Sequence, residues 1–282
     1  MQFQLPRRPA DGHKGTFGRI AIIAGSPGMS GAACLAGKAA LRSGAGLVTV
    51  AVPKSIQPIV ATFEPSYMTV ALSCGDDGRL TTAVAAEILE LLASQDAVAI
   101  GPGLGQEPAS RELVRALISR VNVPLILDAD ALNAVAADGL SMVRNAPTIV
   151  TPHPGEFSRL TGRSTDEIHS NRQKLSAEYA GQTGTVVVLK GAGTVVTNGV
   201  QTCVNSTGNS GMATGGAGDV LTGVITALCG QGIDAYEAAV AGVYAHGLAG
   251  DLYVQDRSAR GMIASDLLDY LPSAWARLET DQ

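Results

Sequence analysis

Short, continuous apolar segments alternate along this chain with longer segments in which apolar residues recur at helical spacing. Continuous apolar segments are typical of strands that are buried on both faces of a parallel sheet. The alternation therefore predicts an α/β fold, in which a central and mostly parallel sheet is covered by helices on both faces. The predicted strands are Arg19–Ala24, Leu47–Val52, Ala97–Ile100, Pro124–Leu127, Thr148–Val150 and Thr185–Leu189.

A hairpin and eight helices complete the predicted elements. Asn198-Gly199 is a strong turn signal, so the flanking segments Thr194–Thr197 and Val200–Val204 are expected to pair antiparallel. The predicted helices are Ser30–Ser43, Thr81–Ser94, Glu107–Ser119, Asp130–Ala137, Asp166–Gly181, Gly218–Cys229, Asp234–Tyr253 and Ile263–Leu271. The candidate N-cap residues are Ser30, Thr81 and Asp166.

Size and composition suit one large domain. Of the 282 residues, 46% are hydrophobic and 34 are glycine, so we expect residues 1–282 to form a single domain, with residues 1–18 as a mobile arm. The formal charge of −5 excludes the basic surface that nucleic acids or anionic membranes require. The sequence shows no apolar run of about 18 residues, no signal peptide and no CxxC pair, and therefore predicts a cytoplasmic protein.

Five segments rich in glycine or acidic residues follow the predicted strands. Ligands of open α/β sheets bind beyond the carboxyl ends of the strands. We therefore expect these segments to line one crevice. They are Gly25–Gly28, Gly101–Gly105, Asp128–Asp130, Thr151–Glu156 and Lys190–Gly193.

The strongest candidate for chemistry is the segment 205–219, which contains five glycines and ends in Asp219. Glycines let the main chain approach a ligand, and the N-terminus of the following helix offers free N–H groups to a phosphate. A carboxylate at that place suggests a general base beside a reacting phosphate. A carboxylate is also an ordinary partner of a helix dipole, which is the simpler interpretation of Asp219.

Other polar residues each have a chemical and a structural interpretation. His153 is either a hydrogen-bond donor or acid–base group, or a cap of the following turn. Lys190 either contacts a nucleotide phosphate or is a solvated lysine in a tight turn, and His246 suits helix packing. The candidate oxygen ligands of Mg²⁺, which are equally candidate helix caps, are Asp128, Asp130, Asn133 and Glu156.

Two common phosphate-binding motifs are excluded. Between Gly31 and Lys38 the glycine spacing is one residue too long for a P-loop, and Ala39 replaces the required Ser or Thr. No GxGxxG follows the first strand, so a Rossmann fingerprint is absent. The small residues Gly31–Ala33 instead suit either a flat ligand or close helix packing.

Seven motifs in order resemble the ADP-dependent (S)-NAD(P)H-hydrate dehydratase family, which belongs to the ribokinase-like superfamily. Each motif alone is weak, but their shared order over nearly the whole chain is highly specific. The motifs are Gly31–Ala33, Leu41–Gly46, Gly101–Gly105, Leu127–Asn133, Thr151–Glu156, Leu189–Gly191 and Asn209–Asp219.

The resemblance implies a ribokinase-like three-layer α/β/α fold and a repair reaction. Hydrated NADH or NADPH would be dehydrated while ADP, or ATP in its place, is consumed, with Mg²⁺ bridging phosphate oxygens. It implies Asp219 as the base and the N–H groups of Gly216, Ala217 and Gly218 as the anion hole. The implied nucleotide-binding residues are Lys190, Gly191, Ala192, Gly193, Thr194 and Gly218, and the implied substrate-binding residues are Ala32, Gly103, His153 and Asp219.

The resemblance also implies a homotetramer and a functional link to an NAD(P)H-hydrate epimerase, whose module we do not expect in this chain. Two other functions stay open. A kinase of a vitamin-precursor alcohol, such as a thiazole or pyrimidine, would share the Gly215–Asp219 run. A nucleotide-binding regulator without turnover would not need Asp219. The Thr151–Glu156 turn together with the Gly101–Gly105 loop favours the dehydratase.

Overall fold

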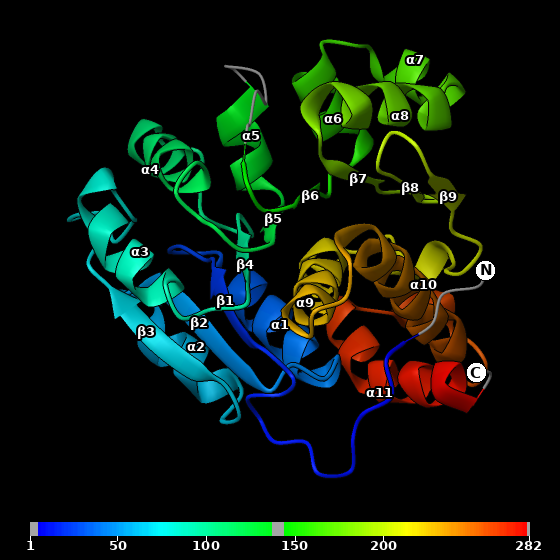
Figure 1. The fold of residues 1–282 in the computed structure, drawn as a ribbon, viewed down its shortest axis with the longest axis horizontal. Coiled ribbons are helices and arrows are strands. Elements are labelled where there is room, and N and C mark those ends of the chain that lie inside the picture. The colour runs from blue at the N-terminus through cyan, green and yellow to red at the C-terminus, as the bar shows by residue number, and fades with distance from the viewer. Residues whose placement is uncertain (1–4, 137–143, 281–282) are drawn as a thin grey trace.

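The computed structural model describes residues 5–136 and 144–280. Within these residues the strands form one sheet in the order β3-β2-β1-β4-β5-β6-β7-β8-β9, shown in Figure 1. The pairs from β3 to β7 are parallel, and β7, β8 and β9 are antiparallel, which confirms the expected hairpin. The strands are β1 Arg19–Ile23, β2 Leu47–Pro53, β3 Met68–Leu72, β4 Ala97–Ile100, β5 Leu125–Leu127, β6 Thr148–Val150, β7 Val186–Leu189, β8 Val195–Thr197 and β9 Thr202–Val204.

Helices cover both faces of the sheet, which confirms the three layers. Alternate residues of β1 point to the two faces, with Ile20 and Ile22 in one core and Ala21 and Ile23 in the other. The first core is covered by α1 Ser30–Arg42, α2 Gln57–Phe63, α9 Ala217–Gly230, α10 Ala235–Tyr253 and α11 Ala264–Thr280. The second is covered by α3 Ala85–Leu92, α4 Pro108–Ile118, α5 Asp130–Ala136, α6 Pro154–Thr161, α7 Thr165–Ser170 and α8 Arg172–Thr183.

The helix starts differ from the expected ones. Met29 rather than Ser30 is the N-cap of α1, and Ser158 and its neighbours belong to a helix, α6, that was not expected. Thr81 precedes a 3₁₀ turn and makes no side-chain cap. Ser164, not Asp166, caps α7, because its hydroxyl accepts a hydrogen bond from the N–H of Glu167 at 3.2 Å.

Other elements are shorter, longer or additional. The expected helix Asp166–Gly181 is divided at Asn171 into α7 and α8. The last helix, α11, continues through Pro272 to Thr280 rather than ending at Leu271. Helix α2 and strand β3 were not expected, and the expected end of α5 at Ala137 lies outside the described residues.

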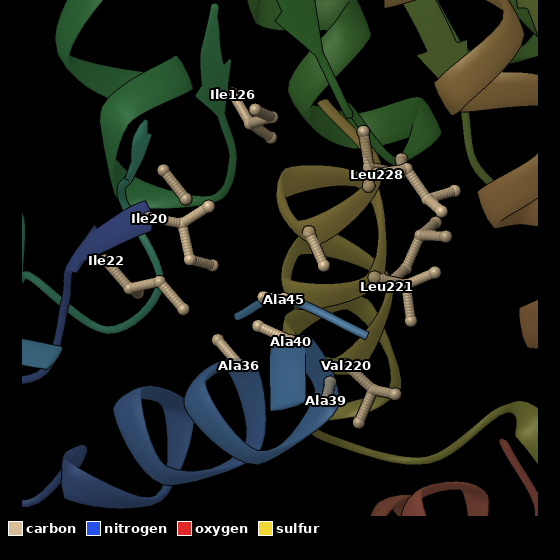
Figure 2. Packing of buried hydrophobic residues seen from close by; sticks show 14 of the residues in the cluster. Ile20, Ile22, Ala36, Ala39, Ala40, Ala45, Ile126, Val220, Leu221 and Leu228 are labelled. Carbon is tan, nitrogen blue, oxygen red and sulfur yellow. The ribbon is translucent and has the colours of Figure 1, made fainter. Parts of the chain in front are cut away.

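Close packing between α1 and α9 sets the position of the Gly-rich segment. Figure 2 shows Ala36, Ala39 and Ala40 of α1 facing α9. At Gly223 of α9, a Cβ atom would collide with the carbonyl oxygen of Ala36. Since only small residues lie at the crossing, the two helices approach closely. This contact holds the N-terminus of α9 at the carboxyl edge of the sheet.

Candidate active site

The expected loops meet at the carboxyl edge of the sheet. Strand order reverses between β1 and β4, which is where ligands of such sheets bind. The loops that follow these two strands are joined, because Gly25 donates its N–H to the carbonyl of Pro102 at 2.8 Å. The hydroxyl of Ser26 also donates to the carbonyl of Gly103 at 2.8 Å. The crevice therefore has a rigid floor.

The N-terminus of α9 opens toward this edge. Gly216 is its N-cap with φ +92°, a left-handed conformation that favours glycine. Among the described residues, the backbone N–H groups of Gly216, Gly218 and Asp219 have no intramolecular acceptor, and that of Ala217 makes only a long 3.4 Å bond to Thr214. Free N–H groups at a helix N-terminus form a site for an anion.

Asp219 lies in the first turn of α9, beside these N–H groups. Burial, followed by the negative charge of Asp128, raises the pKa of the Asp219 carboxyl from 3.8 to about 7. The nearby ammonium of Lys190 opposes this change. A carboxyl with a pKa near neutrality suits general base catalysis better than a simple partner of the helix dipole.

Lys190 is not the solvated lysine of a turn. Its Nζ donates to Asp128 Oδ1 at 2.7 Å and lies 3.9 Å from Glu156 Oε2. Burial alone would lower the pKa of Lys190, but the charges of Asp128 and Glu156 raise it above its usual value, so the ammonium is charged. The other oxygen of Asp128 accepts a hydrogen bond from the hydroxyl of Thr222 at 2.8 Å.

His153 is the N-cap of α6, as the simpler interpretation proposes. Its Nδ1 accepts hydrogen bonds from the N–H groups of Gly155 at 3.0 Å and Glu156 at 3.3 Å. Burial, and then the charge of Lys190, lower the pKa of His153, so the ring is neutral at pH 7. With Nδ1 as an acceptor, the proton is on Nε2. The side chain is 51% exposed, so Nε2 is available as a donor.

The remaining predicted residues lie in two groups. A Cβ atom at Gly103 would be 3.0 Å from that of Ala32, so these two expected substrate residues are neighbours. Leu35, one turn after Ala32, lies against Gly216, which brings this pair beside the N-terminus of α9. The turn Gly191–Thr194 is closed by a 2.9 Å bond from the Thr194 hydroxyl to the carbonyl of Gly191.

The four candidate oxygen ligands do not form a metal site. Asp128 is paired with Lys190, and Asp130 accepts a hydrogen bond from the N–H of Gly105 at 2.8 Å. Asn133 accepts one from the guanidinium of Arg159 at 2.8 Å. Within the described ranges, no three His, Cys, Asp or Glu side chains are arranged to hold a metal ion.

Two further residues belong to this site although no motif singles them out. Thr222 is fully buried and bonds to Asp128. Its position three residues after Asp219, on the same face of the helix, is a signal that could have identified it. Arg172 donates to the carbonyls of Leu189 and Lys190 at 2.8 and 3.1 Å, and thereby supports the end of β7. No spacing in the sequence indicates Arg172.

Comparison with known proteins agrees with this geometry. The family model of the NAD(P)H-hydrate dehydratases matches residues 20–273. A bifunctional NAD(P)H-hydrate repair enzyme of Moorella thermoacetica is 48% identical over 99% of this chain and 53% of its own length. An ADP-dependent (S)-NAD(P)H-hydrate dehydratase of Bacillus subtilis is 38% identical over 98% of this chain and 95% of its own. The chain thus spans about half the length of the bifunctional relatives.

Solved structures show the same architecture. The ADP/ATP-dependent NAD(P)H-hydrate dehydratase of B. subtilis, co-crystallized with ATP/Mg²⁺, has a TM-score of 0.83 and 37% identity, and the match covers 97% of this chain and 94% of that one. A ribokinase-like superfamily protein of Enterococcus faecalis has a TM-score of 0.82 and 26% identity, with 96% and 91% covered. The expected ribokinase-like fold is therefore confirmed, and the chain belongs to the NAD(P)H-hydrate dehydratase family.

Proposed function

We propose that this chain dehydrates the S epimer of hydrated NADH or NADPH and converts ADP to AMP and phosphate in the same cycle. One observation carries the proposal. The Asp219 carboxyl, with its pKa raised to about 7 by burial, stands beside the free N–H groups of Gly216 and Gly218. A base and an anion hole at one point suit phosphoryl transfer to a hydroxyl. The names of the B. subtilis and M. thermoacetica relatives support the same reaction.

The chemistry avoids expulsion of hydroxide, a poor leaving group. The hydroxyl oxygen of the hydrated ring attacks the β-phosphorus of ADP, the bond to AMP breaks, and Asp219 takes the hydroxyl proton. The carbon–oxygen bond of the resulting ester then breaks as the lone pair of the ring nitrogen moves in, and phosphate leaves. Loss of a proton from the adjacent ring carbon restores the dihydropyridine.

Each residue of the site has a role in this scheme. The N–H groups of Gly216, Ala217 and Gly218 stabilise negative charge on the transferred phosphoryl group. Lys190 adds a positive charge there and, with Gly191, Ala192, Gly193 and Thr194, holds the nucleotide. Ala32 and Gly103 contact the hydrated ring, where small residues let a flat group approach. His153 donates a hydrogen bond from Nε2 to the substrate.

Mg²⁺ accompanies the nucleotide in this proposal. Because the described residues offer no set of three side-chain ligands, the ion would be held by phosphate oxygens and water. This mode of binding is common for Mg²⁺. Bound there, the ion would offset the negative charge of the phosphates.

The competing kinase would leave a stable phosphorylated alcohol, whereas the dehydratase releases inorganic phosphate. ³¹P NMR of a reaction with hydrated NADH, ADP and Mg²⁺ distinguishes them. We expect resonances of AMP and phosphate only. A lasting phosphate ester, or consumption of ATP only with a thiazole or pyrimidine alcohol, would favour the kinase. Nucleotide binding with no change in the spectrum would favour the regulator.

We further propose that residues 1–282 are one domain that acts as a homotetramer in the cytoplasm. The single sheet and the continuous cores support one domain, and the unpaired cysteines suit a reducing compartment. No helix in the described part of the chain is long and apolar enough to cross a membrane. The bifunctional relatives support a functional link to an epimerase. Light scattering coupled to gel filtration tests the tetramer.

A further inference from the structure

Asp128 holds together three elements at the centre of the site. It follows β5 and is only 1% exposed. One of its oxygens accepts from Lys190 at the end of β7, at 2.7 Å, and the other accepts from Thr222 of α9, at 2.8 Å. A buried carboxylate with both oxygens paired is fixed in orientation. Its position therefore determines where the Lys190 ammonium lies.

That ammonium lies against the anion hole. A Cβ atom at Gly218 would be 3.2 Å from Lys190 Nζ and 3.9 Å from Asp128 Oδ2. Gly218 lies at the open N-terminus of α9, where the free N–H groups are. The positive charge of Lys190 and the positive end of the helix thus converge on one point.

Lys190 has several anionic neighbours between which it must be divided. Asp128 and Asp130 follow β5, Glu156 begins α6, and all three act on Asp219 together with Lys190. Lys190 pairs with Asp128 and lies 3.9 Å from Glu156, but among the described residues it forms no ion pair with Asp219. A lysine side chain is flexible, so without Asp128 it would be free to pair with the base.

The other titratable groups at this place are two histidines. His153, at the start of α6, and His246, on α10, both lose proton affinity through burial, which lowers the pKa of His246 to about 4. Both rings are therefore neutral at pH 7 and add no charge near Asp219. The balance of charge around the base thus depends on the four carboxylates and Lys190.

We propose that Asp128, held by Thr222, is a positioning residue that keeps the Lys190 ammonium beside the α9 N-terminus and unpaired with Asp219. In that position Lys190 attracts the transferred phosphoryl group, while Asp219 stays free to accept a proton. This inference rests on the proposed function for its catalytic meaning. The arrangement of charges itself is testable without turnover.

The first experiment is a ¹³C NMR titration of aspartate carboxyls in the free protein, with Asp219→Asn to assign the resonance. In the wild type we expect Asp219 to titrate near 7. In Asp128→Asn, which keeps the shape of the side chain, the midpoint should fall by a unit or more, because a repelling charge is lost and Lys190 is released. An unchanged midpoint would overturn the proposal. If wild-type protein restores no NADH, the proposed function fails, but this titration still decides the role of Asp128.

The second experiment uses the hydroxyl of Thr222 in case Asp128→Asn does not fold. Thr222→Val removes the hydroxyl and keeps the volume, and we expect kcat to fall about tenfold with KM for ADP changed less than about twofold. Thr222→Ser keeps the hydroxyl and should restore kcat. Thr226→Val is the matched control, since Thr226 is equally buried one turn later but bonds only to its own helix, at 2.6 Å. Equal losses of kcat in Thr222→Val and Thr226→Val would overturn the proposal.

Discussion

Gly223 of α9 lies directly on the backbone carbonyl of Ala36 in α1, so that the crossing of the two helices has no room for a side chain. Gly223→Ala should force the helices apart and lower the free energy of unfolding by about 1–3 kcal/mol. Gly181→Ala in α8 is the control, because a Cβ there meets no atom within 4 Å, and it should be slightly stabilising. Urea denaturation measures both. Equal stability of the two variants would show that the crossing tolerates a side chain.

Gly218→Ala tests the contact between Lys190 and the anion hole. The new methyl group would lie 3.2 Å from Lys190 Nζ, where it displaces the ammonium and crowds a bound phosphate. We expect kcat to fall about a hundredfold with no loss of thermal stability. Gly215→Ala, whose Cβ meets no atom within 4 Å, should be affected much less. Steady-state kinetics and a melting curve measure the pair, and full activity of Gly218→Ala would contradict the assigned anion hole.

The rate should depend on pH through Asp219. Its pKa is raised by burial to about 7, and the base works only when it is deprotonated. As pH rises from 5.5 to 8.5, kcat/KM should therefore increase and level off above a midpoint near 7. A rate that stays level across this range, at saturating Mg²⁺, would mean that no group with such a pKa acts as the base.

His153 combines a cap of α6 with a donor on Nε2, and two variants separate these roles. His153→Asn keeps a side chain that caps helices well but removes Nε2, so we expect KM for hydrated NADH to rise with little change in stability. His153→Ala loses both functions and should also lower stability by about 1 kcal/mol. Kinetics and thermal melts measure both variants. Wild-type KM in His153→Asn would leave His153 as a cap only.

Strands buried on both faces are predictable from this sequence, whereas the edge strand is not. β7 is four buried apolar residues, which is an unambiguous pattern. In β3, Met68 is 48% exposed and its neighbours are half-buried, so neither a continuous apolar run nor strict alternation marks it. Helix α6 is hidden by its flanking prolines, although Pro154 at the first position is favourable for a helix start.

Strand order predicts that the loops with His153, Lys190 and Asp128 share one edge, because parallel strands bring their carboxyl ends together. It does not predict which side chains pair. Lys190 and Asp128 lie 62 positions apart, and their 2.7 Å contact depends on the packing of β5 against its neighbours and of α9 beside them. The raised pKa of Asp219 likewise follows from burial, which no motif reveals.

The most direct test of the account is a coupled measurement on purified protein with hydrated NADH, ADP and Mg²⁺. The absorbance of restored NADH is recorded together with the release of phosphate, for the wild type and for Asp219→Asn. We predict one NADH restored per phosphate released in the wild type, and loss of both signals in the variant, because the hydroxyl proton then has no acceptor. Near-full turnover in Asp219→Asn, or phosphate release without NADH, would contradict the central role of Asp219.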